Sequence, residues 1–83
     1  MIRIEVFTKN MALQKTIELE TDIVPRIGET IFFKMDVLDN DRSHLVHDVI
    51  YNVSKQGLTP VVYCHEATPG EHRKFVLEEH GWL

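Results

Sequence analysis

Apolar and polar residues alternate along the first part of the chain. Residues 1–7 and 13–21 both follow this period of two, which is typical of a half-buried β-strand. Between them, residues 8–11 include Asn10, which tolerates the left-handed backbone conformation that a short hairpin loop needs. The pattern therefore predicts an N-terminal β-hairpin. Its apolar positions are Ile2, Ile4, Val6, Leu13, Ile17 and Leu19.

Turn-forming residues precede the next alternating segment. Pro25 fixes its own backbone and disfavours a helical conformation at Val24. Gly28 can adopt a conformation that a residue with a Cβ resists. In residues 30–37, which follow, every second residue is large and apolar, so a shift of one residue would turn the apolar face outward. The sequence predicts a turn that sets the register of a third strand over 30–37.

Two further strands are predicted in the second half of the chain. Residues 44–53 are apolar on both faces, with Val46 and Ile50 opposite the face that carries Leu45 and Val49. A strand of this kind is usually covered on both sides or strongly bent. After a loop that contains a glycine, residues 59–66 form a fifth apolar segment.

The last residues of the chain change from strand alternation to helix signals. Thr68 is a suitable N-cap, Pro69 suits the first helical position, and Gly81 suits the position after the last turn. We therefore predict a C-terminal helix over 68–80. A helix this short is not stable alone, so we expect it to dock against the sheet. The apolar positions that remain for it are Phe32, Val46 and Ile50.

These elements predict one small domain over residues 1–83. The fold class is mainly β, or α+β at the margin, with five strands in a small curled sheet or an SH3-like barrel and one C-terminal helix. A chain of this length buries roughly 60–65% of the surface that it exposes when unfolded. A deep pocket enclosed within one chain is therefore not expected.

The turn before the third predicted strand carries a resemblance to a known family. Pro25, Arg26, Gly28, Glu29 and Ile31 form the pattern P-R-x-G-E-x-I. In a short all-β chain, this pattern resembles the strand entries of small SH3-like barrels, among them bacterial proteins of uncharacterised function. The resemblance implies a fold and no activity. It does not extend to peptide binding, because the clustered aromatic residues and acidic loops of SH3 ligand sites are not evident.

The charge of the chain argues against nucleic acid as a partner. Nine Lys and Arg residues stand against thirteen Asp and Glu residues, and only Arg73 and Lys74 of the basic residues are adjacent. Affinity for nucleic acid depends on a basic stripe that displaces counterions. We therefore do not expect nucleic-acid binding. A small barrel that binds single strands stays as a further alternative.

Targeting and catalytic motifs do not stand out. No apolar run reaches the length of a membrane span, and charge enters the N-terminus at Arg3, so we expect a cytoplasmic protein without membrane contact. Cys64 is the only cysteine and lies in an apolar strand, where it acts as a small hydrophobic residue. No phosphate-binding loop or hydrolase motif occurs. We expect no cofactor, and an enzyme is not the favoured interpretation.

Five histidines in a short chain raise the question of a metal site. His44 and His47 are three residues apart, which places them on opposite faces of a regular strand. The close ligand pairs that are typical of zinc sites are missing. We therefore expect surface or partly packed histidines and no metal. The alternative is a metal-binding protein or small enzyme that uses His44, His47, Asp48 and His65.

The predicted function is that of a protein-interaction or accessory module whose partner is another protein or a second copy of the chain. Exposed strand edges and a leftover apolar patch favour symmetric pairing, so a homodimer is expected first. The predicted contact residues are Phe32, Val46 and Ile50, with Arg26 and Lys34 at the rim.

Overall fold

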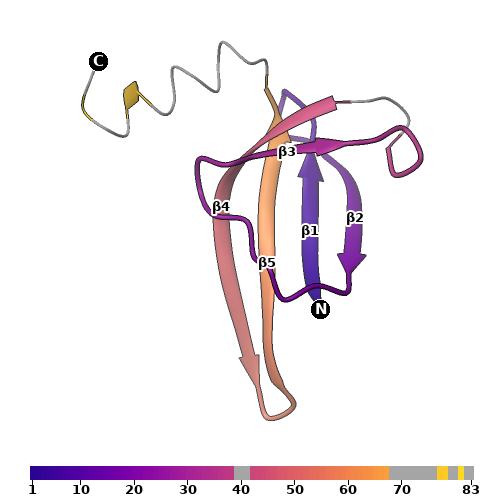
Figure 1. Ribbon diagram of the computed structural model, residues 1–83, viewed down its shortest axis with the longest axis vertical. Coiled ribbons are helices and arrows are strands. Elements are labelled where there is room, and N and C mark those ends of the chain that lie inside the picture. The colour runs from indigo at the N-terminus through magenta and orange to yellow at the C-terminus, as the bar shows by residue number, and fades with distance from the viewer. Residues whose placement is uncertain (39–41, 68–76, 79–80, 82–83) are drawn as a thin grey trace.

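The computed structural model describes residues 1–38, 42–67, 77–78 and 81, and five strands form one sheet in the order β2-β1-β5-β4-β3 (Figure 1). Neighbouring strands are antiparallel except β1 and β5, which are parallel. The mainly β, five-stranded fold predicted from the sequence is confirmed. The strands are β1 (Ile2–Phe7), β2 (Leu13–Leu19), β3 (Thr30–Phe33), β4 (Arg42–Ser54) and β5 (Gly57–Glu66).

The sheet curls because β3 and the segment before it cross in front of β4 and β5 (Figure 1). β3 pairs with only the first part of β4, from Thr30 opposite Leu45 to Phe33 opposite Arg42. Two backbone hydrogen bonds then join Val46 to the segment before β3. The Val46 carbonyl accepts from the N–H of Gly28, and the Val46 N–H donates to the carbonyl of Glu29. This crossing segment closes one face of the sheet.

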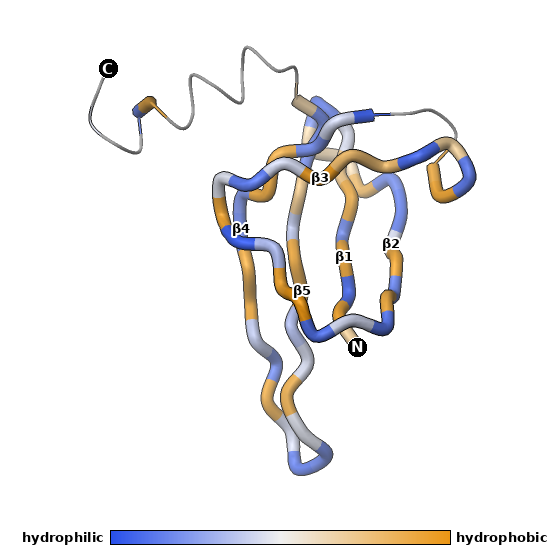
Figure 2. Tube along the Cα trace, in the orientation of Figure 1, coloured by the Kyte–Doolittle hydropathy of each residue, from blue (hydrophilic) through white to orange (hydrophobic). Residues whose placement is uncertain are grey.

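The hydrophobic core lies between that face and the crossing segment. Hydrophobic and hydrophilic residues alternate along β1 and β2 (Figure 2), and the buried apolar ones form one row on this face of the sheet. Side chains of the crossing segment and the residues after β3 cover this row from the other side. We call this side of the sheet the core face and the opposite side the outer face. The buried core residues are Ile2, Ile4, Val6, Ile17, Phe33, Leu38, Val46, Val62 and Cys64.

The third strand is shorter than predicted. β3 ends at Phe33, and the carbonyl of Lys34 accepts backbone hydrogen bonds from Val37 and Leu38, both at 3.0 Å. The chain therefore turns over 34–38 where the alternation predicted a strand to 37. The turn buries Leu38 in the core, and this burial outweighs the local strand pattern.

A β-bulge interrupts β4. Val46 pairs with Cys64, but Asp48 pairs with the preceding residue of β5, Tyr63, so His47 is an extra residue. A bulge bends its strand and breaks the alternation of faces. Val46 consequently lies on the core face, whereas Ile50 lies on the outer face. The prediction that these two residues share a face is wrong for this reason.

Most of the predicted C-terminal helix, 68–80, lies outside the described residues, and so does its docking. Within it, Leu77 and Glu78 are helical. Gly81 has a φ of 75° and its N–H donates to the Glu78 carbonyl at 3.1 Å, which fits the predicted helix end. In the described part of the chain, no helix has the length and apolar character needed to cross a membrane.

The N-terminal hairpin is confirmed, but its left-handed residue is Met11 and not Asn10. The backbone N–H of Thr8 donates to the Ala12 carbonyl at 2.8 Å, and the backbone N–H of Met11 donates to the Thr8 carbonyl at 2.9 Å. Met11 has a φ of 65°. This conformation costs a residue with a Cβ about 1–2 kcal/mol of conformational free energy. The loop closes through these two hydrogen bonds with Met11 in the left-handed conformation.

We expect Met11→Gly to raise the free energy of unfolding by about 0.5–1 kcal/mol, since glycine removes the strain at a smaller cost in chain entropy. Urea unfolding followed by circular dichroism measures the change. Asn10→Gly is the matched control and should lower the stability slightly, because Asn10 has no positive φ to relieve. A gain at Asn10 that equals the gain at Met11 would contradict this account.

Candidate functional site

The bulge in β4 brings two imidazoles together on the outer face. The Nδ1 atoms of His47 and His65 are 2.9 Å apart, and the ring centroids are 4.9 Å apart. A hydrogen bond at this distance needs one donor and one acceptor, so the two Nδ1 atoms share a single proton. The pair joins β4 to β5 where the regular ladder is interrupted.

Two aromatic side chains border this pair. The Phe7 ring lies 6.0 Å from His47 and 6.2 Å from Tyr63, and Tyr63 lies 6.5 Å from His47, all between ring centroids. The four side chains come from β1, β4 and β5, and each is half-buried. We call Phe7, His47, Tyr63 and His65 the histidine cluster. The rings of Phe7 and Tyr63 pack beside the imidazoles and shield part of them from water.

Burial also sets the protonation state of His47. Loss of solvation lowers the pKa of His47 below its ordinary value of 6.5, and the nearby His65 lowers it further. The carboxylate of Asp48 opposes this shift and raises the pKa. Because burial is the largest of these effects, His47 is neutral near pH 7, with a lone pair on its ring.

The structure divides the four residues of the metal-binding alternative. His44 lies on the core face, is almost fully buried, and packs edge-on against Phe33 at 5.0 Å between ring centroids. Asp48 accepts a hydrogen bond from the N–H of Val49 at 2.9 Å. Only His47 and His65 come together. Among residues 1–38, 42–67, 77–78 and 81, no group of three or more His, Cys, Asp or Glu side chains is arranged to hold a metal.

The lone thiol is not available for chemistry. Cys64 is fully buried on the core face, and its Sγ lies 3.8 Å from the carbonyl oxygen of Glu5. Burial raises the pKa of the Cys64 thiol to about 12. A nucleophilic cysteine needs access and a lowered pKa, and Cys64 has neither.

The residues of the predicted contact patch do not form one surface. Val46 is fully buried in the core, whereas Phe32 and Ile50 are 51% and 42% exposed. Phe32 pairs with Ser43, seven positions before Ile50, which corresponds to about 20 Å along the strand.

The two predicted rim residues lie in different surroundings. The Lys34 ammonium lies 5.2 Å from the centre of the Phe32 ring, within the range of a cation–π contact. Arg26 belongs to the segment before β3, where its N–H donates to the Glu29 carboxylate at 2.6 Å. Lys34 therefore accompanies Phe32, and Arg26 lies beside Ile27 and Tyr51.

A second candidate site is the distal part of the β4–β5 hairpin, which projects from the body of the protein (Figure 1). We call residues 50–60 the arm. Val53 opposite Leu58 and Tyr51 opposite Pro60 continue the core face onto it. Three of these side chains are mostly exposed, Tyr51 at 53%, Val53 at 76% and Leu58 at 57%. The arm therefore presents an apolar face.

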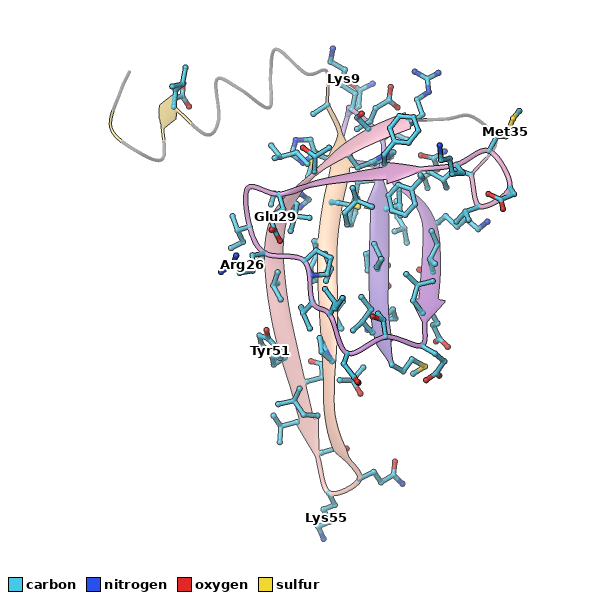
Figure 3. All side chains as sticks on the ribbon, viewed as in Figure 1. Lys9, Arg26, Glu29, Met35, Tyr51 and Lys55 are labelled. Carbon is cyan, nitrogen blue, oxygen red and sulfur yellow. The ribbon has the colours of Figure 1, made fainter. Side chains whose placement is uncertain are left out.

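An open groove lies at the base of the arm. It has a volume of about 340 Å³ and lies between the segment before β3 and β4. Figure 3 shows Arg26 and Tyr51 on the same side of the molecule, with Lys55 at the tip of the arm. The groove extends the apolar face of the arm toward the core. Its lining residues are Pro25, Arg26, Ile27, Val49 and Tyr51.

The edge of β4 along the arm is also free. β3 covers β4 only from Arg42 to Leu45, and in the described part of the chain no strand pairs with the side of residues 48–54 that faces away from β5. Residues 49–54 contain no charged side chain. Natural sheet edges are usually protected by charges, prolines or a covering segment. Asp48 begins this edge, and residues 49–54 contain no charge or proline and pair with no other strand in the described part of the chain.

Neither candidate was predicted from the sequence as the structure shows it. The only sequence signal for the arm is that residues 49–53 carry apolar residues on both faces, and this pattern predicts a covered or bent strand and not an exposed one. The bulge at His47 has no glycine or proline to mark it. The chain matches no protein-family model, no curated protein and no solved structure at significant similarity.

Stability should depend on pH through the buried histidines. Because the pKa of His47 is lowered in the folded protein, the unfolded chain binds the proton more readily, and protonation favours unfolding. The free energy of unfolding should be highest above pH 6.5 and fall as the pH drops from there to the lowered pKa. His44, whose pKa burial also lowers, adds to the same loss.

Urea unfolding at about pH 7.5 and about pH 5 tests this dependence, since the interval spans histidine titration. His47→Gln should reduce the difference between the two pH values, because glutamine does not titrate. Ile50→Gln, on the same strand and face, should leave the difference as in the wild type. An undiminished difference in His47→Gln would show that His47 does not contribute.

Proposed function

We propose that the protein is a protein-interaction module that self-associates through the arm. The observation that carries this proposal is the free edge of β4, uncharged over residues 49–54, beside an apolar face. Tyr51, Val53 and Leu58 together expose much of their surface, and burying such side chains fully is worth about 1.5–3 kcal/mol each. A partner that covered the arm would recover part of this free energy.

The backbone of the free edge selects an extended strand as its partner. A strand added to residues 48–54 would use main-chain groups for affinity and the apolar face for further contact. A second copy offers the same edge, and two such edges pair antiparallel about a two-fold axis. The proposal is therefore a symmetric dimer with a sheet that continues across the interface.

Charge supports a second copy at this edge. The whole chain has a net charge of −4, but the only charged residue between positions 49 and 60 is Lys55, at the tip of the arm. Two arms therefore meet without bringing acidic residues together. The outer strand at the opposite end of the sheet, β2, contains Lys15 and Glu18, and Lys15 Nζ contacts the carbonyl of Val37. That edge carries the protection that β4 lacks.

The proposal also includes an SH3-like classification and a cytoplasmic location in a bacterium. An SH3-like classification is supported by the curled five-stranded sheet and the turn around Gly28. A bacterial cytoplasmic protein is the setting in which such small barrels are expected, and the buried, unpaired Cys64 fits a reducing compartment.

We expect the wild-type protein to be a dimer in native mass spectrometry and in light scattering after size exclusion. Val53→Lys places a charge at the most exposed apolar position of the arm and should raise the dissociation constant by at least about tenfold, since one factor of ten corresponds to about 1.4 kcal/mol. Circular dichroism and urea unfolding establish that the variant remains folded.

The matched control is Phe32→Lys, because Phe32 is also an exposed apolar residue and its β4 partner, Ser43, lies about 30 Å from Val53 along the strand. It should leave the dimer unchanged. A wild type that is monomeric at every concentration rules out self-association. A dimer that dissociates in Phe32→Lys and persists in Val53→Lys moves the interface from the arm to the Phe32 surface.

A further inference from the structure

The histidine cluster lies on the outer face and takes no part in the proposed dimer, so it calls for a separate explanation. We propose that His47 and His65 together chelate one divalent transition-metal ion of the class that imidazole binds, such as Zn²⁺, Ni²⁺ or Cu²⁺, through their Nδ1 atoms.

The distance between the two nitrogens fits this role. Imidazole nitrogens bind such ions at about 2.0–2.1 Å. Two ligands at a right angle on one ion are then about 2.9 Å apart, and two at a tetrahedral angle are about 3.4 Å apart. The Nδ1 atoms of His47 and His65 are 2.9 Å apart, which matches the separation of two ligands at a right angle, and each ring would turn so that its lone pair points at the ion. When the ion binds, the ring that carries the shared proton on Nδ1 becomes the tautomer with its proton on Nε2, so both imidazoles stay neutral.

The backbone supplies the convergence. β4 and β5 pair from His44 opposite Glu66 to Ser54 opposite Gly57, and the ladder is irregular only between Val46 and Asp48. Bulges often re-aim a side chain next to a functional site. Here the inserted residue is His47, and the insertion is what places it beside His65.

A carboxylate near the pair favours positive charge and opposes the effect of burial. Phe7 and Tyr63 border the two rings, and the carboxylate of Asp48 is close enough to act on the charge of His47.

The ion would keep open coordination positions. In the described part of the chain, no third His, Cys, Asp or Glu side chain is placed to complete a metal site around the pair. Water or an exchangeable ligand would therefore fill the remaining positions, as in metal sites that stay accessible. The site belongs to an exchangeable ion and not to one that the fold requires.

Titration of untagged protein with ZnCl₂ and with NiCl₂ in a calorimeter tests the proposal. We expect one ion per chain in the wild type. His47→Ala and His65→Ala should each weaken binding by at least about tenfold, since even the loss of a residue that only supports a ligand costs that much. With Cu²⁺ as the probe, electron paramagnetic resonance should show two coordinated nitrogens in the wild type and fewer in each variant.

The double variant His72→Ala/His80→Ala is the matched control for histidines elsewhere in the chain and should bind as the wild type does. Binding that survives in His47→Ala and His65→Ala but disappears in the double variant overturns the assignment, as does a wild type that binds no better than His65→Ala. The monomeric Val53→Lys variant should still bind one ion per chain, which separates this proposal from self-association.

Discussion

The parallel pairing of β1 with β5 holds the structure together. β1 and β2 form one hairpin, β4 and β5 form another, and this central ladder joins them into a single sheet. Its register aligns Ile4 with Val62 and Val6 with Cys64, so the apolar rows of both hairpins meet on one face. Without it, each hairpin would be a two-stranded unit, which is marginally stable at best in water.

The bulge at His47 is the second constraint, and it separates two roles along one strand. Before it, Val46 fills the core and is bonded to the segment that crosses the sheet. After it, the strand continues beyond the region that this segment covers and becomes the arm. The inserted histidine faces outward and meets His65. The single inserted residue thus leaves Val46 on the core face, places Ile50 on the outer face, and brings His47 beside His65.

Much of the fold could be predicted from the sequence, because half-buried strands carry a period of two, which β1, most of β2 and β3 follow, and because β5 is a short apolar segment after a glycine-containing loop. The failures lie where long-range contacts override local pattern. β3 stops at Phe33 because burial of Leu38 requires a turn, and the left-handed loop residue is Met11, although residue preference favours Asn10. Two of the four candidate metal ligands, His47 and His65, do converge, but only through a bulge that has no local signal.

The β1–β5 ladder also affects how the protein is made. Arg3 pairs with Val61, so β1 leaves the ribosome well before its partner has been synthesised. At about 5–20 residues per second, that interval is roughly 3–12 s. During it, the apolar row of the nascent N-terminal hairpin has no sheet to join. A newly made chain therefore exposes this row for seconds before the residues that complete the core have been synthesised.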